Sequence, residues 1–563
     1  MTAARSTIAL FLVITALAAF VRLPVLKQGL WEDEATAVYV AESPNAREFL
    51  RRQAAIDYSP PLFNALLAGY GRVLGFGEVP VKALAIALGA VVCGAVAAAA
   101  AELFGPIAGL LAGLFAAENR VLIDMSAEVR PYSLSAALAA LSMWAVFRFQ
   151  RRRRSGRRLR GDGILPFVLF VLTSMSHYAG TVAVGAIGVF AMLMAFGRKN
   201  RRLWLPIAGC AAAAGVLFLP WLPIVWRQVH IGFPWAGAMR PGSVRSIFEF
   251  KALSLLPGMP ASASRWAIFG LALALAAFLA SSGGVRAELR RRAAPLGLLA
   301  LAIAGPFFAV GLKAPPVRYI TVPVALSMIL CGGLMGITVR GARATGLWEH
   351  RIALAAVVVM AACSARQGLA ERAGAAAAAR AGVPKTILRG FFRDGVLRKG
   401  DLVIGAPDMI GPTLWYYAPP GVVVRGFVHW SEPAFENFGD YAELWRDPTI
   451  VDRCLAALDD DVRSHAVRRV VLVWAVGGDG KLPFRTRIDQ LREGIRRRFS
   501  LVSTNEFTGP GERIRIDVFE TSLDRRRLSR GDRMPSGALF ARGPETDHSG
   551  AEETACGRAR AES

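Results

Sequence analysis

The strongest constraint on how this chain folds is a series of long apolar runs without charged residues. Examples are residues 6–21, 83–101, 266–283 and 319–339. A helix of about 20 apolar residues crosses the roughly 30 Å hydrocarbon core of a bilayer. The chain of 563 residues is 54% hydrophobic and has a mean hydropathy of +0.40. These features predict an α-helical polytopic membrane protein.

Eleven transmembrane helices are predicted in residues 1–370. They lie near residues 6–26, 79–101, 106–122, 131–149, 163–180, 181–196, 203–225, 263–281, 295–312, 319–338 and 352–369. The first resembles a signal peptide, because Arg5 precedes an apolar core that ends in small residues. Many spans follow it, so we expect it to remain in the protein as an uncleaved span.

Clusters of arginine predict the orientation of these helices. The net charge is +25, and the clusters fall between spans at residues 151–160, 198–202, 286–292 and 340–351. All four share the predicted side of the N-terminus, and loops rich in Lys and Arg stay in the cytoplasm. This bias explains the basic composition without a nucleic-acid partner. Residues 27–78, called the first loop, and the chain beyond residue 370 are then expected outside.

A small α/β domain is predicted within residues 371–523, after the last span. Strands are predicted at residues 401–406, 422–427, 469–476, 501–507 and 514–519, and a helix at 485–499. Residues 524–563 are polar and poor in aromatic side chains, so they are predicted to be disordered. The six cysteines include no Cys-x-x-Cys pair, which argues against a disulfide framework or a thiolate zinc site.

The first loop holds the candidate catalytic residues in two acidic motifs. They read Trp31-Glu32-Asp33-Glu34 and Asp57-Tyr58-Ser59-Pro60-Pro61. Carboxylates in such a loop serve as general bases or as metal ligands. The alternatives are a solvated acidic pair on a surface helix and an ordinary helix N-cap at Asp57 or Ser59.

Isolated polar and aromatic residues stand at the predicted outer ends of the spans. They are Arg22, Lys82, Glu128, Arg130, Tyr132, His177, Tyr178, Lys313, Arg318 and Tyr319. Interfacial anchoring accounts for many such residues in membrane proteins, and a lone histidine more often has a structural role. However, carboxylates that face cations also suit a lipid substrate with a phosphate group. The cations hold the phosphate while a carboxylate deprotonates an incoming hydroxyl.

The order of these motifs resembles that of the GT-C glycosyltransferases, in particular the protein O-mannosyltransferase-like branch. This branch includes bacterial aminoarabinose transferases of lipid A and galacturonic acid transferases of the lipopolysaccharide core. The resemblance extends over residues 8–340 and is carried by residues 31–34, 57–62, 74–82, 104–112, 126–132, 177–178 and 318–319. Two positions depart from the pattern: Lys82 stands where arginine is usual, and Ser59 where histidine is frequent.

The resemblance implies an inverting transfer of a sugar from a polyprenyl-phosphate donor to an envelope glycolipid, glycan or protein in the bacterial inner membrane, on the periplasmic side. Asp33 is the predicted general base, and Glu34 and Asp57 are the other predicted catalytic residues. The predicted substrate-binding residues are Lys82, Glu128, Arg130, Tyr132, His177, Tyr178, Arg318 and Tyr319. Positive charge for the leaving phosphate comes either from these cations or from a divalent metal ion held by Asp33 and Asp57.

Two other functions stay open at this point. A transporter or flippase of lipid-linked sugars would place charges or broken helices in mid-membrane, whereas the predicted spans are nearly free of charge. A non-catalytic envelope assembly protein would work through the C-terminal domain. The aromatic residues of that domain, including Trp415-Tyr416-Tyr417, His429-Trp430 and Trp445, either stack on sugar rings or form its core.

Overall fold

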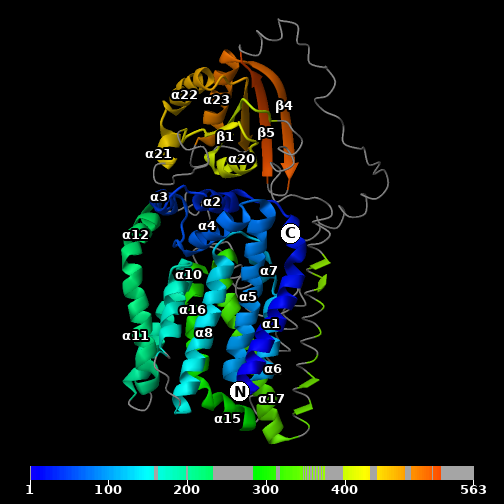
Figure 1. Ribbon diagram of the computed structural model, residues 1–563, viewed down its shortest axis with the longest axis vertical. Coiled ribbons are helices and arrows are strands. Elements are labelled where there is room, and N and C mark those ends of the chain that lie inside the picture. The colour runs from blue at the N-terminus through cyan, green and yellow to red at the C-terminus, as the bar shows by residue number, and fades with distance from the viewer. Residues whose placement is uncertain are drawn as a thin grey trace, which may run out of the picture.

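A computed structural model gives a helical bundle with a small α/β domain at the end where the first loop lies (Figure 1). It describes residues 2–156, 161, 163–197, 201–231, 283–311, 317–346, 397–430, 441–475, 483–509 and 512–521, with scattered residues between 348 and 373. The predicted span at 263–281 and the predicted tail at 524–563 lie outside the described residues, as does most of the predicted span at 352–369.

Six helices in the described part are long and apolar enough to cross a membrane. They are α1 (Thr2–Arg22) with η1 (Leu23–Lys27), α5 (Glu78–Phe104), α8 (Tyr132–Arg154), α10 (Tyr178–Phe196), α11 (Arg201–Phe218) with η2 (Leu219–Trp221) and α12 (Leu222–Ile231), and α17 (Thr321–Thr345) with η7 (Val317–Ile320). The chain is therefore a polytopic helical membrane protein, as predicted. The predicted number of eleven spans stays a prediction.

Two bent helix pairs raise this number to eight if each pair is one span. They are α6 (Pro106–Glu118) with α7 (Arg120–Ser126), bent by 61°, and α15 (Gly283–Arg291) with α16 (Ala293–Pro306), bent by 69°, the latter followed by η6 (Phe307–Gly311). Helix α9 (Ile164–Ser174) is shorter than the span predicted there. The buried Arg22 braces the first bend, because its guanidinium donates to the carbonyl of Ala117 and to Ser126 Oγ.

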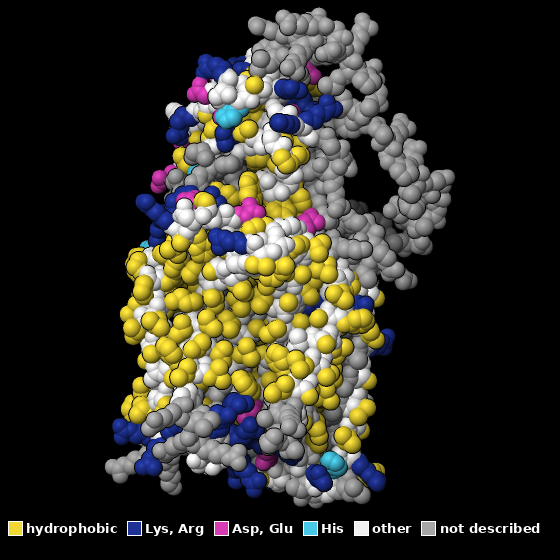
Figure 2. Space-filling view, in the orientation of Figure 1, with side chains coloured by type: hydrophobic (Ala, Val, Ile, Leu, Met, Phe, Trp, Pro, Cys, Tyr) yellow, Lys and Arg dark blue, Asp and Glu magenta, His cyan; other side chains and the backbone are white. Residues whose placement is uncertain are grey.

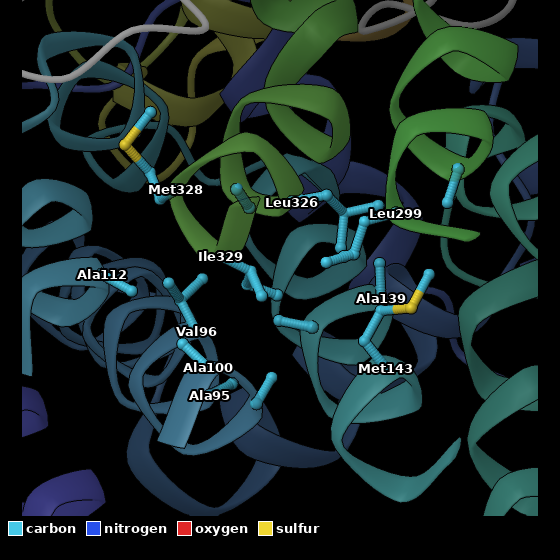
Figure 3. Packing of buried hydrophobic residues seen from close by; sticks show 14 of the residues in the cluster. Ala95, Val96, Ala100, Ala112, Ala139, Met143, Leu299, Leu326, Met328 and Ile329 are labelled. Carbon is cyan, nitrogen blue, oxygen red and sulfur yellow. The ribbon is translucent and has the colours of Figure 1, made fainter. Parts of the chain in front are cut away.

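Helix α5 lies at the centre of the bundle and packs against α1, α6, α8 and α17. Small residues allow this close approach, as is usual between membrane helices. A Cβ on Gly94 would come within 2.2 Å of Thr15 Oγ1 on α1. In Figure 3, Val96 and Ala100 of α5 lie beside Ile329 of α17 in the same apolar interior.

The two ends of the bundle differ in charge. Figure 2 shows a broad hydrophobic belt, with Lys and Arg gathered at the end away from the α/β domain. At that end Arg292 and Arg340 donate to the last carbonyls of α5, Leu103 O and Phe104 O. Cations at a helix C-terminus also match the negative end of its dipole. The arrangement fits the predicted orientation, which remains a prediction.

The first loop folds into three short helices. They are α2 (Glu32–Ala41), α3 (Ala46–Ile56) and α4 (Leu62–Leu74). Helix α3 begins at Asn45, whose side chain accepts a hydrogen bond from the Glu48 amide at 2.9 Å. Pro60 and Pro61 precede α4 and fix the backbone there. These local signals place Asp33 in the first turn of α2 and Asp57 at the end of α3.

The α/β domain contains a five-stranded sheet with the strand order β2-β1-β3-β5-β4. The strands are β1 (Asp401–Ala406), β2 (Val423–Gly426), β3 (Arg469–Ala475), β4 (Ser500–Gly509) and β5 (Glu512–Glu520), with helices η8 (Asp408–Ile410), α20 (Gly411–Tyr417), α21 (Tyr441–Arg446), α22 (Ile450–Ser464) and α23 (Phe484–Arg498). Strand β1 pairs in parallel with β2 and β3. Strand β5 pairs antiparallel with both β3 and β4. All five predicted strands and the predicted helix are confirmed.

Candidate active site

Five segments that are distant in the sequence meet at the first-loop end of the bundle. They contribute Asp33 from α2, Asp57 from the end of α3, Arg130 from the α7–α8 connection, His177 from the start of α10 and Arg318 from η7. Hydrogen bonds and ion pairs between these segments hold them together. The structure thus brings most of the predicted site residues to one place.

Asp33 forms an ion pair with Arg318. Its Oδ2 accepts a hydrogen bond from Arg318 Nη1 at 2.8 Å. The Arg318 guanidinium also lies 5.5 Å from the ring centroids of both Trp31 and Tyr319, within cation–π range. The Asp33 side chain is 35% exposed, twice the 17% of Arg318. The carboxylate is therefore accessible to a ligand while its partner is held by the protein.

Asp57 is buried and orients Arg130. Its carboxylate accepts from Arg130 Nη1 at 3.3 Å and Nη2 at 3.2 Å. Ser59 Oγ and Asn64 Nδ2 donate to the same carboxylate at 3.0 and 2.6 Å. Arg130 Nη1 reaches further, to the backbone carbonyl of Asp33 at 3.2 Å. Burial opposes the charge of Arg130, but the neighbouring Asp57 keeps its pKa above the usual value.

Both arginines carry an unused hydrogen-bond donor. Among the residues that the structure describes, neither Arg130 Nε nor Arg318 Nε has a hydrogen-bond partner, although both atoms are buried. A buried unsatisfied donor costs about 1–3 kcal/mol, or more on a charged group. Such groups are rare in folded proteins and mark a functional site or a missing partner. Two of them flanking Asp33 suit an anionic ligand.

Glu34 and Lys82 form a second ion pair that is fully buried. Lys82 Nζ donates to Glu34 Oε1 at 2.6 Å and to the carbonyl of Ala127 at 2.7 Å. Glu34 also accepts from the amides of Val129, at 2.8 Å, and Trp31, at 3.1 Å. This placement differs from the predicted catalytic role of Glu34 and substrate-binding role of Lys82, because both side chains are 0% exposed and bind each other.

His177 lies in an aromatic cluster beside the two arginines. Its ring is 5.4 Å from that of Tyr132 and 6.2 Å from that of Tyr319. Nδ1 accepts a hydrogen bond from the amide of Ala179, so the neutral ring carries its proton on Nε2. Burial and the nearby arginines lower the pKa of His177 to about 3. At neutral pH His177 is thus an uncharged hydrogen-bond donor.

The family comparison matches residues 58–226 to the family described as dolichyl-phosphate-mannose-protein mannosyltransferase. ArnT from Cupriavidus metallidurans in the apo state superposes with a TM-score of 0.55 and 14% identity, covering 92% of this chain and 98% of that chain. ArnT bound to undecaprenyl phosphate gives a TM-score of 0.54 with the same identity and coverage. Archaeal oligosaccharyltransferase AglB from Archaeoglobus fulgidus, in complex with an inhibitory peptide and a dolichol-phosphate, gives 0.47 at 10% identity, over 83% and 69% of the two chains. No curated protein matches the sequence.

The chain has the GT-C fold. The predicted fold class, a GT-C-like membrane bundle with a small C-terminal α/β domain, is therefore confirmed. The resemblance to the lipid A aminoarabinose transferase, inferred above from short motifs, is confirmed as well. At 14% identity the superposition establishes the fold alone, and the roles of individual residues rest on the geometry of the candidate site.

Two further predicted substrate-binding residues, Tyr178 and Glu128, lie beside the candidate site. The hydroxyl of Tyr178 donates to Gln228 Oε1 and accepts from Trp221 Nε1 at 3.3 Å. Gln228 Nε2 in turn donates to the carbonyl of Asp57 at 3.1 Å. Tyr178 thus braces the first loop against α12. Glu128 is half-buried and lies within electrostatic range of Arg318.

Three residues whose side-chain amides support the candidate site were not predicted. Asn64 Nδ2 donates to Asp57, and Gln53 accepts from Asn64 at 2.7 Å while it donates to the carbonyl of Ser59 at 2.8 Å. Gln228 is the third. The sequence carries one signal for them, because Asn64 interrupts an otherwise apolar helix start at residues 62–68. Gln53 and Gln228 stand among charged residues and give no such signal.

The acidic residues do not fit the predicted divalent metal ion. The Asp33 and Asp57 carboxylates point their oxygens at Arg318 and Arg130. Within the described ranges, no group of three or more His, Cys, Asp or Glu residues is arranged to hold a metal ion. The two guanidinium groups bind the carboxylate oxygens that a metal ion would need as ligands. We therefore derive no catalytic step through a metal.

Proposed function

We propose that this GT-C protein is a membrane glycosyltransferase that moves a sugar from a polyprenyl-phosphate donor to the hydroxyl of an envelope glycolipid or glycan, with inversion. The observation that carries the proposal is that Arg130 and Arg318, which both bind Asp33, each have an Nε donor without a hydrogen-bond partner among the described residues. ArnT, which shares the fold, was crystallised with undecaprenyl phosphate. The matched family is described by dolichyl-phosphate-mannose, which is also a polyprenyl-phosphate sugar.

The donor phosphate is held by the two arginines. Each donates to an aspartate through a terminal nitrogen and has a buried Nε without a hydrogen-bond partner among the described residues. Guanidinium groups bind phosphate through strong charge-assisted hydrogen bonds. His177 adds an uncharged donor through its Nε2 proton. These groups neutralise the charge that grows on the phosphate as the sugar leaves.

Asp33 acts as the general base. Its carboxylate takes the proton of the acceptor hydroxyl, whose oxygen forms a bond to the anomeric carbon from the face opposite the phosphate. The bond between that carbon and the phosphate oxygen breaks, and its electron pair leaves with the polyprenyl phosphate.

We place the reaction on the outer face of a bacterial inner membrane. The arginine clusters at the opposite end of the bundle support this orientation. A lipid-linked donor suits that side, because it stays in the membrane and the transfer needs no nucleotide sugar. The α/β domain lies on the same side as the site (Figure 1).

The test is sugar transfer by the purified protein in detergent, followed as release of polyprenyl phosphate from a lipid-linked sugar. Detergent abolishes transport, so release also separates a transferase from a flippase. Asp33→Asn should lower the rate by about 10²–10⁴-fold, the usual effect of losing a general base. The matched control Asp124→Asn alters an exposed aspartate on α7 and should stay within about twofold of wild type. An Asp33→Asn rate within about threefold of wild type would contradict the assignment.

A further inference from the structure

Helix α20 of the α/β domain docks on the first loop through three consecutive aromatic residues. The ring of Trp415 meets that of Tyr39 edge-on at 5.0 Å. The Tyr416 hydroxyl donates to the carbonyl of Phe76 at 2.9 Å. The Tyr417 hydroxyl reaches the N-terminus of α2. These side chains, considered above as sugar-stacking or core residues, instead join the domain to the loop that carries Asp33.

Tyr417 completes a closed ring of contacts around the start of α2. Its hydroxyl accepts the amide proton of Leu30 at 2.7 Å and donates to Glu78 Oε1 at 2.6 Å. Glu78 begins α5, one turn before Lys82. Lys82 returns to α2 through its ion pair with Glu34. The short segment between Leu30 and Glu34 is thus held at both ends.

We infer that Tyr417 is a positioning residue for the Asp33 carboxylate, an inference that rests on the proposed function. Asp33 lies inside the held segment, three residues after Leu30 and one before Glu34. The first turn of a helix has unpaired amides and frays unless it is tied down. A catalytic group displaced by about 1 Å can lose about 10²-fold in rate. Tyr417 of the α/β domain holds this turn at Leu30, and Lys82 of α5 holds it at Glu34.

The tyrosine hydroxyl is suited to this place. Burial and the hydrogen bond to Glu78 raise the pKa of Tyr417, so it keeps its proton and donates to the carboxylate at neutral pH. The same oxygen accepts from the backbone of Leu30. A phenylalanine would preserve the ring packing and remove both hydrogen bonds.

The adjacent tyrosine supplies a matched control. Tyr416→Phe removes a hydrogen bond of the same helix to Phe76, which lies outside the ring of contacts. We compare Tyr417→Phe with Tyr416→Phe in the purified full-length protein by hydrogen exchange of a peptide covering residues 29–35 and by transfer kinetics. Tyr417→Phe should speed exchange of that peptide and lower kcat by about tenfold, with the donor KM within about twofold. Tyr416→Phe should resemble wild type in both readouts, although it also removes a hydrogen bond between α20 and the first loop.

A second variant tests the pairing itself. Glu78→Leu removes the acceptor and should lower kcat as Tyr417→Phe does, and the double variant should be no worse than either single one. Glu78→Gln keeps an acceptor oxygen and should retain most of the activity.

Unchanged exchange in Tyr417→Phe would overturn the inference, and so would faster exchange with an unchanged kcat or an equal effect of Tyr416→Phe. Absence of any transfer by wild type would contradict the proposed function instead. In that case the exchange data alone decide whether Tyr417 orders the start of α2.

Discussion

Two neighbouring acids of the first loop have opposite environments. Asp33 and Glu34 share the first turn of α2 and each pairs with one cation, Arg318 and Lys82. The Asp33 carboxylate is 35% exposed, whereas the Glu34–Lys82 pair is 0% exposed. Successive side chains of a helix point about 100° apart, so one acid faces the site and the other faces the interior. The Asp33–Arg318 pair can therefore exchange partners with a ligand, whereas the Glu34–Lys82 pair fixes the loop.

Removal of Lys82 tests the buried pair and should have the largest effect. Lys82→Met leaves Glu34 buried without its cation, and breaking a buried pair costs about 3–5 kcal/mol. We expect a large loss of thermal stability in detergent, measured by unfolding monitored by tryptophan fluorescence. Arg318→Met, at the partly exposed pair, is the matched comparison and should lower the unfolding temperature less than Lys82→Met does.

The double variant Lys82→Met with Glu34→Gln separates charge from packing. A neutral glutamine leaves no buried charge, and its one carbonyl oxygen can still accept from the amide of Val129 or from that of Trp31, which bind different oxygens of Glu34. It should therefore recover a good part of the stability that Lys82→Met loses. If Lys82→Met unfolds at the wild-type temperature, the buried pair does not fix the loop.

Removal of Arg318 tests the exchangeable pair. Arg318→Ala should weaken binding of undecaprenyl phosphate by about 10–100-fold, because a hydrogen bond to a charged group contributes about 1.5–3 kcal/mol. The affinity can be measured by native mass spectrometry or by displacement of a labelled lipid. Arg120→Ala, a largely exposed arginine on α7, is the control and should bind as wild type does. An unchanged affinity in Arg318→Ala would make this residue an interfacial anchor.

Acidification should destabilise the protein through His177. The unfolded chain binds a proton on this side chain below a pH of about 6.5, whereas the pKa of His177 in the folded protein is lowered to about 3. Between these values the unfolded state binds more protons, so stability falls as the pH falls, by at most about 1.4 kcal/mol per unit. His177→Gln should reduce this slope, and His230→Gln, at an exposed histidine, should leave it unchanged. Equal slopes in wild type and His177→Gln would show that the buried ring does not stay neutral.

Chelation of divalent metals should have the smallest effect. Because Asp33 and Asp57 bind Arg318 and Arg130, we expect transfer in EDTA to stay within about twofold of the untreated rate. Loss of activity that returns with added magnesium or manganese would mean that the arginines give way to a metal during the reaction.

The sequence predicts the position of the site well. Each apolar run fixes where a span ends, and alternate spans end on the same side of the membrane. Arg130 and Arg318 stand at such ends and Asp33 and Asp57 in the loop between the first two spans, and the structure brings them together. The strands of the α/β domain are predicted for a similar reason, since β1 is apolar after Asp401 and is buried along its whole length.

The partners within the site are not predictable in the same way. Asp33 and Arg318 are separated by 285 residues, and their contact depends on how α2 is rotated about its axis. Helix α2 is buried on most sides, so its pattern shows no polar face from which that rotation follows. The prediction also omits α22, although Val451, Leu455 and Leu458 recur at helical spacing. Docking of α20 depends on contacts between domains, which local patterns do not encode.

The contact between Leu30 and Tyr417 also sets the order in which the protein can mature. The two residues are 387 positions apart. At a synthesis rate of about 5–20 residues per second, the first loop waits about 20–80 s for its partner to leave the ribosome. During that interval the start of α2 lacks its contact with Tyr417, while the ion pair between Glu34 and Lys82 holds it. Biosynthesis thus supplies the contact with Tyr417 only after the segments that form α2 to α17 have been made.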